Sequence, residues 1–118
     1  MSEFGSYVRE KRLKLQGTEP RQYSLRKVAG AIGIEPSYLS KIERGLESPP
    51  GEGTIVALAE ELEEDPDMML ALAGKVSQDL KKIILTRPKI FAEMIRQLKD
   101  MPDHAVLRIV REVRDGEW

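Results

Sequence analysis

The chain has 118 residues, which fits one domain or one small domain with an appendage, and its net charge of −1 gives it no strong overall attraction to nucleic acid. The absence of cysteine excludes disulfides and thiolate metal sites and fits a reducing cytoplasm. No apolar run approaches the roughly 20 residues of a membrane span, and the N-terminal residues lack the apolar stretch of a secretory signal, so we expect a cytoplasmic protein.

The first predicted element is a helix at residues 3–16. Phe4, Val8 and Leu15 form its apolar face. Arg12 lies four residues after Val8, so this charged side chain falls on the same inward face. The helix is followed by a predicted loop at residues 17–23, which contains Gly and Pro.

Residues 23–45 contain the strongest pattern in the chain, which is two short amphipathic helices around one sharp turn. Ser24 is a suitable N-cap for the first of these helices. Pro36 suits the first position of the second helix, which we place at residues 36–44, because its missing N–H is not needed there. Gly33 can adopt the positive φ that the turn requires. The small and apolar positions have the spacing of a helix-turn-helix: Ala29, Gly33, Leu39 and Ile42.

Two further helices are predicted after a connector rich in Pro and Gly at residues 47–53. Thr54 is predicted to cap the first of them. Asp65 and Pro66 start the next helix, and Gly74 ends it. Apolar residues recur at the spacing of one face in the first of these helices: Ile55, Leu58, Ala59 and Leu62.

Residues 76–118 are predicted to form three more helices: Ser77 caps the first, and Pro88 and Pro102 open the second and the third. Each helix has an apolar stripe that is too wide for a helix lying free in water. Three short helices cannot bury these stripes alone, so they must pack on the first five helices, on a second copy of the chain or on another partner. We therefore divide the chain into residues 1–75 and 76–118.

The second and third helices resemble those of a known family. Residues 37–45, SYLSKIERG, resemble the recognition-helix signature of the Xre family of lambda-repressor-like helix-turn-helix regulators, and residues 24–33, SLRKVAGAIG, resemble the preceding helix. The resemblance extends from about residue 4 to residue 74. It implies an all-α fold, in which a five-helix DNA-binding domain precedes about three further helices. It also implies a transcriptional regulator of bacterial or phage type that binds double-stranded DNA.

The third helix carries the candidate base contacts. Ser37, Lys41 and Arg44 are spaced to share one face, whereas Leu39 and Ile42 face the core. Lys41 is suited to donate to O6 and N7 of a guanine, and Ser37 to pair with several bases. Arg44 lies near the helix end and is better placed for phosphate. The alternative for this face is an ordinary solvated polar surface.

The resemblance implies further DNA contacts around these residues. Pro36 stands where the family often has Gln, so it offers a base edge only an apolar contact, for instance with a thymine methyl. The start of the second helix docks against the DNA backbone, where Ser24 and neighbouring N–H groups can bind an anion. Arg26 and Lys27 add positive charge, and Tyr38 can donate a hydroxyl hydrogen bond.

By the same resemblance, Arg12 and Glu43 form a buried ion pair that braces the recognition helix. A guanidinium suits bidentate pairing with a carboxylate, so we expect a structural role for this pair. We find no credible catalytic set, metal site or cofactor site. His104 is the single histidine, and a surface position fits it better than a role as general base.

The charge distribution agrees with a DNA-binding N-terminal part. Residues 1–46 contain nine Lys and Arg against five Asp and Glu, whereas residues 47–75 contain one Lys against eight acids. Phosphate neutralisation would therefore occur where the helix-turn-helix lies. We expect a repressor that binds a near-palindromic operator as a homodimer through residues 76–118. The alternative is an antitoxin-like or protein-interaction module whose C-terminal helices bind a partner protein.

Overall fold

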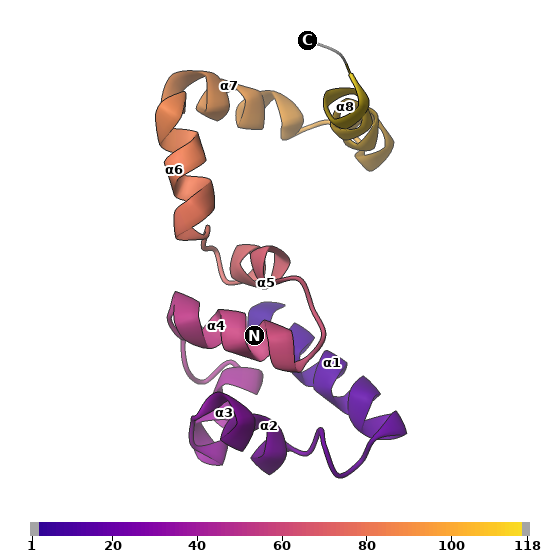
Figure 1. The fold of residues 1–118 in the computed structure, drawn as a ribbon, viewed down its shortest axis with the longest axis vertical. Coiled ribbons are helices and arrows are strands. Elements are labelled where there is room, and N and C mark those ends of the chain that lie inside the picture. The colour runs from indigo at the N-terminus through magenta and orange to yellow at the C-terminus, as the bar shows by residue number, and fades with distance from the viewer. Residues whose placement is uncertain (1–2, 117–118) are drawn as a thin grey trace. The chain divides into compact units, whose positions relative to one another are not determined.

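The computed structural model describes residues 3–116, and within this range the chain has eight helices and no strand (Figure 1). This confirms the predicted all-α class. The outer limits of the predicted domains, residues 1–2 and 117–118, lie outside the described residues. The chain divides into two units, with the boundary between Ser77 and Gln78. The helices are α1 (Glu3–Thr18), α2 (Leu25–Ile32), α3 (Pro36–Glu43), α4 (Glu52–Glu61), α5 (Pro66–Leu72), α6 (Gln78–Thr86), α7 (Pro88–Leu98) and α8 (Asp103–Asp115).

The first unit, α1 to α5, encloses one hydrophobic core. In it α3 packs against α1 and α2, and α4 packs against α2 and α5. All five helices contribute side chains, so each helix is held by its neighbours. The buried apolar residues are Phe4, Val8, Tyr23, Val28, Ala29, Leu39, Ile42, Ile55, Leu58, Ala59, Leu62, Met69 and Leu70.

The end of α1 differs from the prediction. The helix continues through Gly17 to Thr18, two residues beyond the predicted end at residue 16. The Thr18 hydroxyl donates to the carbonyl oxygen of Leu15 at 3.0 Å, and the Glu19 N–H donates to the same oxygen at 2.9 Å, so the last turn is closed. Leu15 is half-buried rather than buried, because it packs at the edge of the core.

The predicted cap of the fourth helix is wrong. Thr54 lies inside α4, which begins at Glu52 after the extended residue Gly51. The Ile55 N–H donates to the carbonyl oxygen of Gly51 at 3.1 Å, so the first helical hydrogen bond already forms there. The carboxylate of Glu52 favours this earlier start, because it lies in the first turn, at the positive end of the helix dipole. The prediction for α5 holds, since Asp65 is its N-cap and accepts from the Asp67 N–H at 3.2 Å.

The second unit has amphipathic helices without a core. No residue of α6, α7 or α8 is buried, and α6 contacts α7. α7 begins at Pro88 as predicted, whereas Pro102 is the N-cap of α8 rather than its first residue. None of the described helices combines the length and the apolar character needed to cross a membrane. The exposed large apolar residues of this unit are Leu80, Ile83, Leu85, Ile90, Met94, Ile95, Leu107, Val110 and Val113.

Candidate nucleic-acid interface

The turn between α2 and α3 has the geometry that the glycine spacing predicted. Gly33 lies in the left-handed region, with φ 77° and ψ 31°, where a side chain would be strained. Its N–H donates to the carbonyl oxygen of Gly30 at 3.3 Å, and the Ile34 N–H donates to that of Ala29 at 3.0 Å. These two bonds satisfy the last carbonyls of α2, so α3 starts at a fixed angle after it. Figure 1 shows α2 and α3 side by side in the first unit.

One face of α3 is buried in the core, and the opposite face is exposed to solvent. Leu39 and Ile42 are 0% and 1% exposed. Ser37, Lys41 and Arg44 are exposed and share the opposite face. α3 therefore presents a short polar row that the core holds in place.

Arg12 and Glu43 join α1 to α3 beneath this row. Arg12 Nε donates to Glu43 Oε2 at 2.7 Å, and Nη2 donates to Oε1 at 2.9 Å, so the pair is bidentate. Both residues are buried, at 7% and 5% exposed. Arg12 Nη1 also donates to the carbonyl oxygen of Tyr23 at 3.2 Å. One guanidinium thus connects α3 to α1 and to the segment before α2.

The candidate backbone contacts lie at the start of α2 and on α3. Ser24 is half-buried, and its Oγ accepts from the Lys27 N–H at 3.2 Å, which leaves its own hydroxyl hydrogen to donate. Arg26 and Lys27 are exposed in the first turn of α2. Tyr38 is half-buried on α3. The two helices that carry these candidates, α2 and α3, are in direct contact.

Two other candidates have restricted positions. Pro36 is half-buried and is the first residue of α3, after the extended residue Glu35. Arg44 is the C-cap of α3, and its Nε donates to the carbonyl oxygen of Ser40 at 3.3 Å. Pro36 and Arg44 therefore lie at the two ends of α3.

A close backbone contact between α1 and α3 determines how near the two helices lie to each other. The sequence analysis did not predict this contact. A Cβ on Gly5 would lie 2.2 Å from the backbone oxygen of Ile42 and 3.2 Å from that of Glu43. A side chain there would push the two helices apart, so the crossing requires glycine. The one signal in the sequence is that Gly5 lies between the inward residues Phe4 and Val8.

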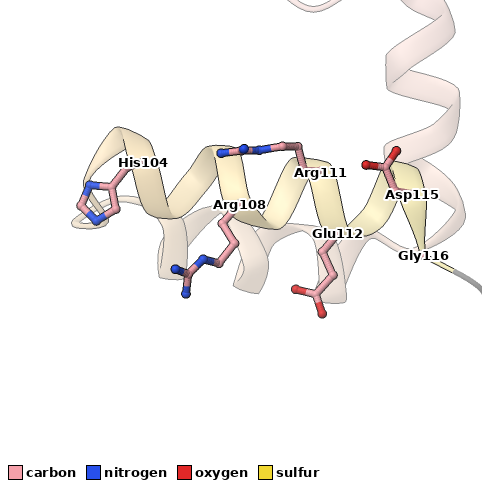
Figure 2. Close-up of a pocket in the computed structure, with 6 residues that line it drawn as sticks. All are labelled: His104, Arg108, Arg111, Glu112, Asp115 and Gly116. Carbon is pink, nitrogen blue, oxygen red and sulfur yellow. The ribbon is translucent and has the colours of Figure 1, made fainter.

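His104 lies in a polar region of the second unit. Figure 2 shows Arg108 and Glu112 extending to one side of α8, and Arg111 and Asp115 to the other, so these charged groups do not converge on one point. Within the described residues, no three His, Asp or Glu side chains lie close enough to hold a metal ion. The hollow at this place is lined by residues of one helix and its cap: His104, Arg108, Arg111, Glu112, Asp115 and Gly116.

The fold and the exposed face of α3 define a small helical domain that contains a helix-turn-helix and is followed by further helices. The family model described as helix-turn-helix matches residues 19–68, a range that contains α2, α3 and α4 and ends in α5. The match covers less than half of the 118 residues. It supports a DNA-binding regulator and a binding domain rather than a catalytic one. No curated protein and no solved structure matches the chain.

Proposed function

We propose that this protein is a sequence-specific transcriptional repressor of the Xre family, which acts on duplex DNA in the bacterial cytoplasm. One observation carries the proposal. The exposed row Ser37, Lys41 and Arg44 lies on a helix whose other face is buried and whose base is held by a bidentate ion pair. A rigid helix with an exposed polar face is what direct reading of a major groove requires.

The candidate contacts fall into two groups with different expected consequences. Pro36, Ser37 and Lys41 face the base edges, where each contact affects one base position. The second group contacts phosphate and so sets register and affinity for every sequence alike. It consists of Ser24, Arg26, Lys27, Tyr38 and Arg44.

Selection of bound duplexes from a random library, at a stated salt concentration, tests the function and the grouping together. Lys41→Ala should relax the preference at one position, with a loss of about 1–3 kcal/mol for the preferred base. Arg26→Ala should weaken binding to all sequences alike and reduce the salt slope by about 0.9. If both variants change the selected sequences in the same way, the grouping is wrong.

The proposed repressor acts as a homodimer through the second unit. Support comes from the apolar stripes of α6 to α8, in which no residue is buried. In a dimer, two copies of α3 would enter successive major grooves about 34 Å apart, so the operator should be near-palindromic. Occupation of such a site would block a promoter.

Sedimentation of the full chain and of residues 1–77 tests this assembly. The shorter chain keeps the whole buried core and the bond from Lys75 Nζ to the carbonyl oxygen of Pro50 at 2.8 Å, so it should fold. We expect it to be a monomer that binds the operator more weakly than the full-length dimer. A shortened chain that is still dimeric would assign the interface to the first unit.

The exposed stripes of the second unit also favour a second candidate function, which is an antitoxin-like module that holds a partner protein. This function predicts a full-length chain that is monomeric alone and aggregates as its concentration rises, because the apolar faces have no partner. Light scattering after size-exclusion chromatography separates the two candidates. A stable dimer supports the repressor, and an aggregating monomer supports the partner-binding module.

A further inference from the structure

A hollow of about 230 Å³ lies between the N-terminal half of α1 and the C-terminal end of α3. The two helices approach closely here, since a Cβ on Gly5 would lie 2.2 Å from the backbone oxygen of Ile42. The hollow is therefore placed relative to α3 by a backbone contact rather than by flexible side chains. Its lining residues come from both helices: Ser6, Arg9, Glu10, Glu43 and Arg44.

The charge of the hollow depends on the buried ion pair behind it. Glu43 accepts hydrogen bonds from Arg12 at 2.7 and 2.9 Å, so its carboxylate is already compensated. Arg44 uses its Nε to donate to the carbonyl oxygen of Ser40. Its two terminal amino groups make no further hydrogen bond to the described part of the chain, and they remain for a ligand.

Arg9 adds a second guanidinium. It is exposed and belongs to none of the ion pairs formed within residues 3–116. Two arginines thus face one uncompensated carboxylate, that of Glu10, and guanidinium groups bind phosphate oxygens in a bidentate manner. We propose that Arg9, together with Ser6 and Arg44, binds one phosphodiester group of the DNA backbone. This inference rests on the proposed function and extends the interface from α3 to α1.

The position of the hollow favours duplex DNA as the source of the phosphate. Arg44 shares the exposed face of α3 with Ser37 and Lys41, so the hollow continues the surface assigned to DNA. α3 has 8 residues, which makes it about 12 Å long, and the major groove is also about 12 Å wide. A helix of this length whose N-terminal residues contact bases has its C-terminal end beside the sugar–phosphate backbone.

The test compares Arg9→Ala with Lys14→Ala in the full-length protein. Both changes remove one exposed positive charge from α1, but Lys14 does not line the hollow of Arg9 and Arg44; it lines a neighbouring one, with Tyr7, Glu10 and Lys11. Both variants should melt at the wild-type temperature, because neither side chain is buried. Affinity for the selected operator is measured across a salt series. Between about 50 and about 200 mM salt, the ratio of the wild-type affinity to the Arg9→Ala affinity should fall about 3.5-fold, because the variant lacks one phosphate contact. The ratio of the wild-type affinity to the Lys14→Ala affinity should stay constant over the same salt range.

A backbone scan then locates the phosphate. Methylphosphonate replaces one linkage of the operator at a time, which removes one negative charge at a known position. One linkage should weaken the wild type when it is neutralised and have no effect on Arg9→Ala. The same linkage should lose its effect in Arg44→Ala, because both arginines are proposed to bind one group.

Three outcomes would overturn the proposal in different ways. If the wild type binds the operator but Arg9→Ala and Lys14→Ala have the same salt dependence, this inference alone is wrong. If the wild type selects no sequence from the library, the proposed function fails and the inference fails with it. In the third outcome, inorganic phosphate at constant ionic strength raises the Tm of the wild type but not that of Arg9→Ala, while the wild type and Arg9→Ala bind the operator with the same affinity. The hollow then binds free phosphate and not DNA.

Discussion

Both units contain helices with apolar side chains at helical spacing, but the units differ in what covers those side chains. In the first unit, apolar side chains from all five helices meet in one core. In the second unit no residue of α6 to α8 is buried, and Leu85 and Ile90 are 72% and 66% exposed. Amphipathic spacing therefore predicts that a helix forms and which side is apolar, but it does not identify what that side contacts.

The difference has a physical cause in the number and arrangement of the helices. In the first unit each of the five helices contacts two others, and together they surround a volume in which each apolar face meets a neighbour. The second unit has three short helices, and a unit of this size buries too small a fraction of its surface to be stable alone. We therefore expect the stability of the first unit to be intrinsic and that of the second to depend on association.

The largest expected effect tests the buried ion pair of the first unit. Glu43→Gln leaves the Arg12 guanidinium buried without a counter-charge and should lower the free energy of unfolding by roughly 3–5 kcal/mol. Asp115→Asn makes the same chemical change in the second unit, where the pair with Arg114 is 65% exposed, and should have almost no effect. Urea unfolding followed by circular dichroism measures both.

Glu35→Gln is the control on α3 itself. Glu35 is exposed and makes no side-chain capping bond, so its loss should not change the melting temperature clearly. Equal shifts for Glu35→Gln and Glu43→Gln would mean that the buried pair does not stabilise the position of α3.

A matched pair of leucines tests the two kinds of apolar face directly. Leu58→Ala empties a fully buried site and should cost about 2–5 kcal/mol. Leu107→Ala removes a side chain that is 55% exposed, so it should change the unfolding of the first unit by less than about 0.5 kcal/mol. It should instead weaken self-association in sedimentation. Similar losses of stability for both variants would show that the second unit shares the core of the first.

Much of the first unit could be predicted because local signals and the core agree. Ser24 caps α2, Gly33 has a positive φ, and Asp65 caps α5, each at the expected residue. Thr54 misled because a hydroxyl residue near a helix start is only one of several ways to begin a helix. Here the N-cap of α4 is Gly51, three residues before Thr54, and it makes no side-chain capping bond.

The candidate interface could be predicted in part. The spacing of Ser37, Lys41 and Arg44 indicated a shared exposed face, because helical geometry alone sets which residues lie together. The hollow beside Arg9 could not be predicted, since it depends on how close α1 and α3 approach. That distance is a property of packing between helices and leaves no periodic signal in either one.

Two glycines provide a test of that close approach. Gly5→Ala places a methyl group 2.2 Å from the Ile42 backbone oxygen, so α1 and α3 must shift, at a cost of about 1–3 kcal/mol. DNA affinity should fall as well, because α3 moves. Gly30→Ala is the control, since its Cβ meets nothing within 4 Å and alanine favours a helix by about 0.5–1 kcal/mol. Thermal melting should therefore shift in opposite directions for the two variants.

The smallest expected effect concerns alkaline pH and belongs to the first unit, which contains all three tyrosines. The Tyr7 hydroxyl donates to the Glu64 carboxylate, and this bond, with burial and the repulsion between phenolate and carboxylate, raises the pKa of Tyr7 above its usual value of about 10. In the pH range between the unfolded and the folded pKa, the folded state binds more protons than the unfolded state. The contribution of the Tyr7 hydroxyl to the free energy of unfolding is therefore complete below about pH 10, and it is lost as the pH rises through the pKa of Tyr7 in the folded state.

Tyr7→Phe isolates this contribution. It should cost about 0.5–1.5 kcal/mol at neutral pH, because the hydrogen bond between α1 and Glu64, in the loop between α4 and α5, is lost. The difference in the free energy of unfolding between wild type and variant should decrease above pH 10, because the wild type loses the same hydrogen bond when the phenol ionises. A gap that stays constant from neutral pH to pH 11 would mean that Tyr7 stabilises the unit by packing and not through Glu64.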